Sequence, residues 1–305
     1  MKKKGPEPTL VLITGPTAVG KSILGAEVAR RLGTGVVSAD ARQFYRELKI
    51  GTAPPDPETL ARAPHHFIGH LSIFDYYNVS LFERQALEVL EKLFETSGYG
   101  VAAGGSGLYL DTLCRGIGDL PDADPGIRAY VQDVFRSGGL EALRKWVKGI
   151  DPVYYDEVDL ANPNRLMRGI EVFLSTGIPF SELRNNQPAR RNFRIKRIVL
   201  NRERSDLFAR INQRVDRMLE DGLVEEAVAF FPYRHLNALN TVGYKELFAW
   251  LANRSSLREA VEKIKTNSRR YAKRQLTWFK RYPEAGWFHP DDLEGIMSFI
   301  RNDRL

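Results

Sequence analysis

A phosphate-binding loop is indicated near the amino terminus by the run Gly15-Pro16-Thr17-Ala18-Val19-Gly20-Lys21-Ser22, which fits G-x-x-x-x-G-K-[ST]. Glycines let such a loop curl until several backbone N–H groups converge on an anion, and the helix that follows adds positive potential. Lys21 supplies a point charge and Ser22 a ligand for Mg²⁺. The motif predicts a di- or triphosphate site without saying what the phosphate carries, and its alternative is a Gly-rich turn with a chance Lys-Ser pair.

The elements around this loop favour the phosphate site. Leu10–Thr14 is a short apolar run that predicts a strand, and Lys21–Leu32 has apolar residues at helical spacing. Val36–Ser38 and Gly100–Ala103 predict two more buried strands. Strands separated by helical segments indicate a parallel sheet with helices on both faces, so we expect an α/β fold with a P-loop NTPase-like core.

A helical insertion is expected in the middle of the chain. Between Gly116 and about Arg194 strand signals disappear, and helices bounded by Pro and Gly are predicted at Asp124–Ser137, Leu140–Gly149, Asp151–Asp159 and Asn164–Thr176. Ile195–Leu200 then predicts a strand that rejoins the sheet, followed by long amphipathic helices. The core should therefore comprise residues 1–117 and 195–305, with an all-helical domain at 118–194.

Asp40 follows the second predicted strand and should project near the phosphate loop, where open α/β folds bind ligands. It could hold Mg²⁺ through water or accept a proton from an attacking nucleophile. An equally weighted alternative is an ordinary N-cap for a helix through Arg42–Glu47. Arg210 and Arg214 lie one turn apart on a predicted helix at Arg204–Leu219 and could point together at an anion, or be ordinary surface charge.

Basic residues gather in two regions of a chain whose net charge is +7 and whose isoelectric point is near 9.4. The first contains Arg184, Arg190, Arg191, Arg194, Lys196, Arg197, Arg202 and Arg204; the second contains Lys263, Lys265, Arg269, Arg270, Lys273, Arg274, Lys280 and Arg281, interleaved with Tyr271, Trp278, Phe279 and Tyr282. Basic groups neutralise phosphates and aromatics stack on unpaired bases, which favours RNA. A solvated helix face with its aromatics in the core is at least as good an explanation for either cluster alone.

Other residue types narrow the possibilities. The only cysteine, Cys114, excludes an internal disulfide and any zinc site built from paired cysteines, and makes the cytoplasm the expected compartment. His65 and His66 are adjacent in an extended segment and should point to opposite sides, so a metal site there is not expected. No apolar run approaches the length of a membrane span. A monomer is expected.

At this point the chain resembles the tRNA dimethylallyltransferases, also called isopentenyl-diphosphate:tRNA transferases, along nearly its whole length. Besides the P-loop, the resemblance rests on Ser38-Ala39-Asp40-Ala41-Arg42-Gln43-Phe44-Tyr45, Ile50-Gly51-Thr52-Ala53, Pro64-His65-His66, Gly104-Gly105-Ser106-Gly107-Leu108-Tyr109, Asn164-Arg165-Leu166-Met167-Arg168, Glu171-Val172-Phe173, Val242-Gly243-Tyr244 and Tyr271-Ala272-Lys273-Arg274-Gln275-Leu276-Thr277-Trp278-Phe279. This ordered set is far more specific than a P-loop alone. The chain departs from the pattern at Ala41, Gly69, Ser106 and Ala161–Asn164, which bears on the detail of tRNA contacts and not on the proposed base.

The resemblance implies a reaction and a set of roles. The substrates would be dimethylallyl diphosphate and adenosine 37 of tRNAs that read codons beginning with U, with N6 of the adenine as acceptor. Asp40 would be the general base, while Lys21, Ser22 with Mg²⁺, and Arg214 would stabilise the departing diphosphate. The helical insertion would grip the anticodon stem-loop, and tRNA contacts are implied at Asp40, Ala41, Arg42, Gln43, Ser106, Arg128, Asn164, Arg165, Leu166, Met167, Arg168, Asn240, Thr241, Val242, Gly243, Tyr244 and Lys245.

Two other functions compete with this interpretation. A P-loop small-molecule kinase would use Asp40 to position a hydroxyl or Mg²⁺ and Lys21 to bind a γ-phosphate, but the basic, aromatic carboxyl-terminal region would then be unexplained. A nucleotide-gated RNA-binding protein without chemistry is the second rival. The carboxylate of Asp40 beside a phosphate loop argues against it.

Overall fold

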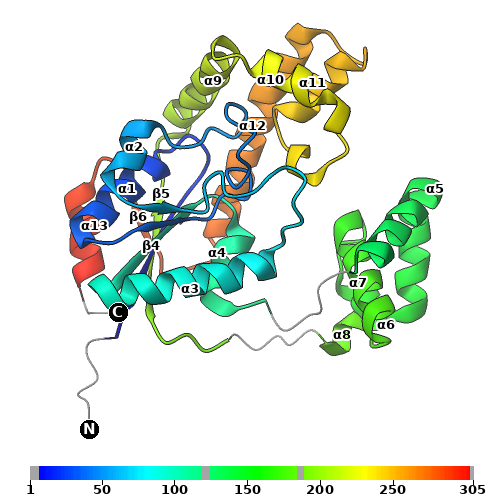
Figure 1. Cartoon of the computed structure of the whole chain (residues 1–305), viewed down its shortest axis with the longest axis horizontal. Coiled ribbons are helices and arrows are strands. Elements are labelled where there is room, and N and C mark those ends of the chain that lie inside the picture. Colours follow the sequence, from blue (N-terminus) through cyan, green and yellow to red (C-terminus); the bar gives the residue numbers. More distant parts are fainter. Residues whose placement is uncertain (1–6, 118–123, 184–188, 303–305) are drawn as a thin grey trace. The chain divides into compact units, whose positions relative to one another are not determined.

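A six-stranded parallel sheet forms the centre of the larger of two compact units, which comprises Met1–Arg115 and Arg191–Leu305 (Figure 1). The computed structural model describes residues 7–117, 124–183 and 189–302. The strand order is β3-β2-β4-β1-β5-β6, and every pairing is parallel. The strands are Thr9–Thr14 (β1), Val36–Ser38 (β2), His65–His66 (β3), Tyr99–Gly104 (β4), Arg194–Leu200 (β5) and Gly286–Phe288 (β6). The predicted α/β class is confirmed.

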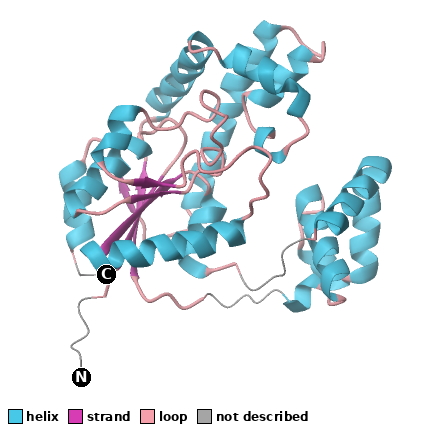
Figure 2. Cartoon of the chain, in the orientation of Figure 1, coloured by secondary structure: helices cyan, strands magenta, loops and turns pink. Residues whose placement is uncertain are grey.

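Helices cover both faces of this sheet (Figure 2). The helices of this unit are Lys21–Leu32 (α1), Pro57–Arg62 (α2), Val79–Ser97 (α3), Gly107–Arg115 (α4), Arg204–Glu220 (α9), Leu223–Phe230 (α10), Tyr244–Leu251 (α11), Leu257–Phe279 (α12) and Leu293–Arg301 (α13), with short 3-10 turns at Phe231–Tyr233 and Asn237–Leu239. Alternation along β1 divides the core, because Val11 and Ile13 pack with α1 and α13 while Leu10 and Leu12 pack with α3 and α4. A third apolar cluster joins α10, α11 and the start of α12.

The smaller unit, Gly116–Arg190, contains helices and no strand among its described residues. Its helices are Pro125–Ile150 (α5), Pro152–Glu157 (α6), Pro163–Thr176 (α7) and Phe180–Leu183 (α8). The two helices predicted before and after Gly139 are both present; they share the label α5 and are separated by a kink at this residue, whose φ of 63° and ψ of −160° are not helical. Asp124 begins α5 by accepting hydrogen bonds from two backbone N–H groups.

The two ends of the core that flank this unit are held together. The Arg191 guanidinium donates to the backbone oxygens of Leu113 at 2.9 Å and Thr112 at 2.8 Å, and it also pairs with Glu83. Arg191 precedes β5, whereas Thr112 and Leu113 belong to α4. One side chain thus fixes the end of α4 to the start of β5 and to α3.

The first basic cluster does not form a single solvated surface, because its members Lys196 and Arg197 are buried, although Arg190 and Arg204 are exposed. Lys196 and Arg197 lie on β5 and are only 6% and 3% exposed. Arg197 packs over the Tyr282 ring at 3.7 Å and forms ion pairs with Asp111 and Glu284. The Arg191 guanidinium is bound to backbone oxygens of α4. A count of charges does not register that a strand is buried, so the expected RNA-binding role does not hold for Lys196 and Arg197. Arg184 lies outside the described residues.

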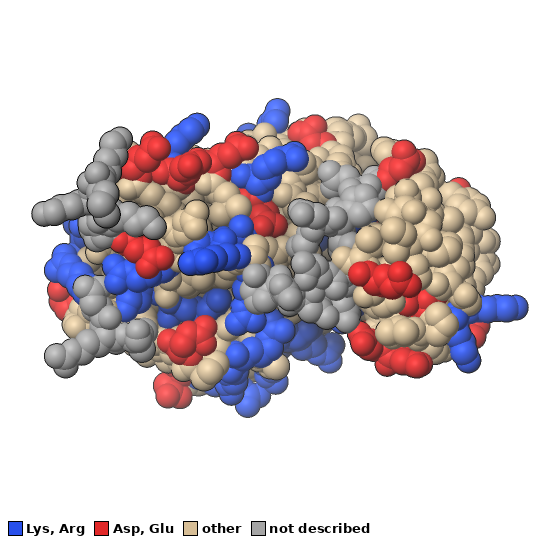
Figure 3. Space-filling view, turned by 90° about the horizontal axis from the view of Figure 1, so that it is seen from below, with Lys and Arg blue, Asp and Glu red and all other residues tan. Residues whose placement is uncertain are grey.

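The second cluster divides between core and surface. Phe279 and Tyr282 are buried, so these aromatic rings belong to the core as the alternative explanation has it. Tyr271 is 37% exposed, and Lys273, Arg274, Lys280 and Arg281 are exposed. On the face shown in Figure 3, Lys and Arg side chains gather on the larger unit. None of the described helices is long and apolar enough to cross a bilayer.

Candidate active site

The phosphate loop follows β1 and leads directly into α1. Gly15 has a φ of 144°, and a Cβ there would lie 2.6 Å from the backbone oxygen of Leu200, so the loop passes β5 at a distance that only glycine allows. Gly20 ends the loop in a left-handed conformation, and α1 starts at Lys21. The curl predicted from the glycine spacing is therefore present, with the start of α1 facing the space above the loop.

Lys21 lies against the loop that it follows. Its Nζ donates to the backbone oxygen of Pro16 at 2.7 Å. The pKa of Lys21 falls from its usual value to about 8, chiefly because the group is buried; Asp40 opposes this shift and Arg214 adds to it. The ammonium group is therefore poorly compensated by the protein alone, and an anion in the loop would stabilise its charged form.

Arg214 approaches the loop from α9. Its Nη1 donates to Thr17 Oγ1 at 3.4 Å, and burial lowers its pKa, with Asp40 acting in the opposite direction and Arg210 in the same one. Arg210, one turn earlier, donates from Nε to the backbone oxygen of Ala18. Both arginines predicted to share an anion thus meet the same loop.

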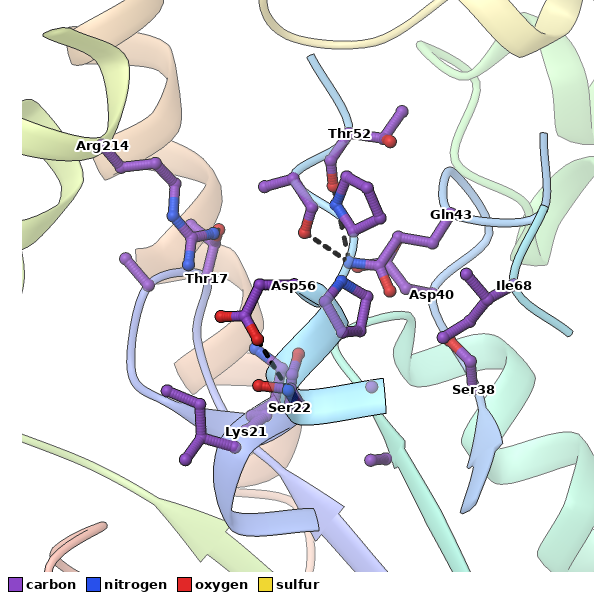
Figure 4. A pocket seen from close by; sticks show the side chains of 18 of the residues that line it. Thr17, Lys21, Ser22, Ser38, Asp40, Gln43, Thr52, Asp56, Ile68 and Arg214 are labelled. Atoms are coloured by element: carbon purple, nitrogen blue, oxygen red, sulfur yellow. Dashed lines mark hydrogen bonds between the residues drawn. The ribbon is translucent and has the colours of Figure 1, made fainter. Parts of the chain in front are cut away.

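A cavity of about 550 Å³ opens above the loop and extends across the carboxyl ends of the strands. In Figure 4, Thr17 and Arg214 lie on one side, Lys21 and Ser22 lie at the base, and Asp40, Gln43, Ser38 and Ile68 lie on the other side. Apolar side chains in its wall include Ile23, Val36, Ile50, Ala53, Pro54, Ile68, Ala103 and Met218. The cavity combines a cationic end with apolar wall, which suits an organic diphosphate.

Asp40 also lines a second cavity of about 390 Å³, which lies next to the first. Both cavities share Thr17, Ala18, Asp40, Thr52, Ala53, Arg214, Met218 and Tyr271 in their walls. Of the residues predicted to contact tRNA, the second cavity contains Asp40, Ala41, Arg42, Ser106, Asn240, Thr241, Val242, Gly243 and Lys245. Asp40 therefore stands where the cavity that contains Lys21 and Ser22 meets the cavity that contains Ser106 and the loop before α11.

The local structure around Asp40 differs from the N-cap alternative. Residues 41–44 form turns and no helix covers Arg42–Glu47, so the alternative is wrong. Asp40 Oδ1 instead accepts from the Arg42 N–H at 3.1 Å in a turn closed by its own side chain. The backbone N–H of Ala41, the residue between Asp40 and Arg42, donates to Ser106 Oγ at 3.1 Å.

Several predicted tRNA-contacting residues have other contacts in the structure. Arg42 donates to the backbone oxygens of Asn237, Ala238 and Asn240, which ties the Asp40 turn to the loop before α11. Gln43 Nε2 donates to the backbone oxygens of Thr52 and Ala53 and lines the first cavity, not the second. The Tyr244 ring is fully buried and its hydroxyl donates to Glu226, so its side chain belongs to the core.

The predicted contacts in the helical unit lie at the start of α7 and on α5. Leu166 is fully buried and Met167 packs against the same core, because the first turn of α7 faces inward at these positions, so the Leu166 side chain has no face for RNA. Arg128 on α5 and Arg168 on α7 both pair with the buried carboxylate of Glu171. Asn164 and Arg165 occupy the exposed side of the first turn.

Residues that the sequence analysis did not place at the catalytic site also build it. Thr52, Ala53 and Tyr271 line both cavities, and Arg274 lines the second. Burial and the nearby Asp40 raise the pKa of Tyr271 to about 12, so its hydroxyl stays protonated. Thr52, Ala53, Tyr271 and Arg274 all lie in motifs that carry the family resemblance, and this was the signal available in the sequence. A motif does not show which of its side chains face a cavity.

The donor atoms near the loop suit a hard cation. The Ser22 hydroxyl and the Asp40 carboxylate line the same cavity, and oxygen ligands of this kind are those that Mg²⁺ accepts together with substrate phosphates and water. Within the described residues no three His, Cys, Asp or Glu side chains are grouped to hold a metal. This donor set fits an ion that takes most of its ligands from phosphate and water.

Comparison with known proteins assigns the chain to a family. Its residues 43–282 match the model described as IPP transferase, and residues 8–75 match that of isopentenyl transferase. It is 48% identical to tRNA dimethylallyltransferase 2 of Parabacteroides distasonis over 96% of this chain and 98% of the relative.

Solved structures of transferases that act on tRNA resemble this chain over most of its length. A full-length tRNA isopentenylpyrophosphate transferase from Bacillus halodurans superposes with a TM-score of 0.69 at 32% identity, covering 96% of this chain and 95% of that chain. A eukaryotic dimethylallyltransferase acting on tRNA gives a TM-score of 0.79 at 25% identity, covering 94% and 75% of the two chains.

Proposed function

The chain belongs to the IPP transferase family, and on that premise we propose that it transfers a dimethylallyl group from dimethylallyl diphosphate to N6 of adenosine 37 in tRNAs that read codons beginning with U. The products are N6-(dimethylallyl)adenosine and diphosphate. The single observation that carries the proposal is the position of Asp40 in the common wall of two cavities, one that reaches Lys21 and Ser22 and one that is lined by Ser106 and Asn240–Gly243.

The two cavities would hold the two substrates. The diphosphate lies over the P-loop against Lys21 and Arg214, and the dimethylallyl group lies on the apolar wall near Ile68. The adenine enters the second cavity past Ser106 and Asn240–Lys245. Mg²⁺, held by Ser22 and the substrate phosphates, would neutralise charge on the leaving diphosphate.

The chemistry requires charge stabilisation at one end and a base at the other. When the bond from C1 of the allyl group to the diphosphate oxygen breaks, Lys21 and Arg214 stabilise the negative charge on the leaving group. As N6 bonds to C1, Asp40 accepts the N6 proton, and we assign Oδ2 to this role because Oδ1 already accepts from Arg42. RNA filling the second cavity keeps water from the allylic carbon.

Beyond the core, the helical unit would grip the anticodon stem-loop. Arg128 and Arg168 support this role, since Glu171 fixes the direction of both guanidinium groups. The exposed basic groups on α12 would meet RNA phosphates from the core unit. A monomer is the proposed working form.

The test gives the protein allyl-labelled dimethylallyl diphosphate, γ-labelled ATP and an anticodon stem-loop with A36-A37-A38. Allyl label that moves to RNA without ATP, and is lost when position 37 is guanosine, supports the proposal. Release of the ATP γ-phosphate instead supports the kinase, and RNA binding without either reaction supports the non-catalytic protein. Nucleoside analysis of the RNA identifies the modified base.

A further inference from the structure

Gln275 makes two long-range hydrogen bonds with its single side-chain amide. It lies on α12 and is 5% exposed. Its Oε1 accepts from the backbone N–H of Thr17 in the phosphate loop at 2.8 Å, and its Nε2 donates to the backbone oxygen of Gly105 at 2.9 Å. One contact needs an acceptor and the other a donor, and a neutral amide supplies both.

The Gly105 end of this bridge leads to Asp40. A Cβ on Gly105 would lie 2.2 Å from Gln275 Nε2, so the loop packs directly on the amide. The next residue, Ser106, donates its backbone N–H to the oxygen of Ala39 and accepts from the N–H of Ala41. Asp40 is the residue between these two bonds, so the loop that Gln275 holds also holds the Asp40 turn on both sides.

The Thr17 end leads to the diphosphate. The Thr17 N–H that binds Gln275 sits in the loop that would hold the leaving group, and the Thr17 hydroxyl accepts from Arg214. Burying an amide with both ends satisfied is favourable, whereas removing one partner leaves a polar backbone group unpaired. The bridge therefore fixes the phosphate loop relative to the Asp40 turn.

We infer that Gln275 is a positioning residue for the transfer: it sets the distance between the allylic carbon, held through its diphosphate, and the Asp40 carboxylate with the adenine beside it. This inference rests on the proposed function. A displacement of about 1 Å between reacting groups is enough to slow a reaction by roughly a hundredfold. Slack between the two loops would let the C1–oxygen bond break while N6 is misplaced. Water then bonds to C1 and loses a proton, giving dimethylallyl alcohol and diphosphate.

The experiment measures how donor is divided between RNA and water. Gln275→Met keeps the length of the side chain and removes both hydrogen bonds, and Gln275→Glu keeps an acceptor for Thr17 but sets a carboxylate against the Gly105 oxygen. Gln85→Met makes the same chemical change on α3, where Gln85 is exposed and its side chain accepts a hydrogen bond from the Tyr77 hydroxyl. Allyl label in RNA and in dimethylallyl alcohol is measured under single turnover, alongside tRNA affinity and thermal unfolding.

We expect Gln275→Met to raise the ratio of alcohol to modified RNA at least tenfold, with tRNA affinity within about threefold of the unchanged protein. Gln275→Glu should change the ratio in the same direction, and Gln85→Met should leave it unaltered. If both Gln275 variants divide the donor as the unchanged protein does, the inference is wrong, even if they are less stable. If one does not fold, the other decides. If the unchanged protein transfers no label to RNA, it is the proposed function that fails.

Discussion

Donor binding should weaken as pH rises through the pKa of Lys21. Burial holds that pKa near 8, so about nine tenths of the protein carries a charged Lys21 at pH 7 and about one tenth at pH 9. A bound diphosphate favours the ammonium form, which raises the pKa in the complex. If only the charged form binds tightly, affinity for dimethylallyl diphosphate falls close to tenfold between pH 7 and pH 9, or about 1.4 kcal/mol.

Titration calorimetry in two buffers of different ionisation enthalpy measures both this loss and its cause. At pH 9 the binding reaction should take up close to one proton per donor, whereas uptake at pH 7 should be small. The phosphate groups themselves ionise near pH 6, below this range. Lys21→Arg is the matched control, because a guanidinium keeps its charge and its profile should be flat. Constant affinity from pH 7 to pH 9 in the unchanged protein would refute the reasoning.

Three further predictions test the site and the fold. Asp40→Ala should abolish prenyl transfer while tRNA affinity stays within about tenfold, since one carboxylate lost from a basic site hardly weakens RNA binding; normal turnover in a discontinuous transfer assay would remove the base assignment. The tRNA affinity measured by filter binding should fall steeply as the salt concentration rises from 50 to 200 mM, as expected when several phosphates are contacted. An affinity that does not change with salt would contradict the proposed contacts between basic groups of α12 and RNA phosphates. Arg197→Leu should lower the free energy of unfolding by about 1 kcal/mol in denaturant titrations, because the Tyr282 ring loses the guanidinium that packs over it and Asp111 loses one of its cationic partners; if the folded variant instead loses tRNA affinity, Arg197 is an RNA contact after all.

The sequence predicted features that depend on local periodicity. The first strand, the phosphate loop and α1 follow one another with alternation, glycine spacing and helical spacing that each leave a mark in neighbouring residues. Four strands were located to within one residue at either end. The edge strand Gly286–Phe288 was not predicted, because this segment is as short as Val36–Ser38 but contains no β-branched residue.

The misinterpreted features depend on residues far apart in the chain. A count of basic residues treated Lys196 and Arg197 as surface charge, although β5 buries both. Asp40 was compatible with an N-cap because its type and spacing were right, and only the turn that it closes with Arg42 decided otherwise. The bridge from Gln275 to Thr17 spans 258 residues, so no local pattern could reveal it.

The contacts of Arg191 bear on how such a protein can arise. A segment can be inserted into a protein without disturbing its fold when the chain leaves the fold and returns to it at nearby positions. Arg191 holds these positions together here, because it joins Thr112 and Leu113 of α4 to the start of β5. The sheet then forms the same contacts whatever lies between these residues. The helical unit can therefore be exchanged for another segment without altering the contacts of the sheet.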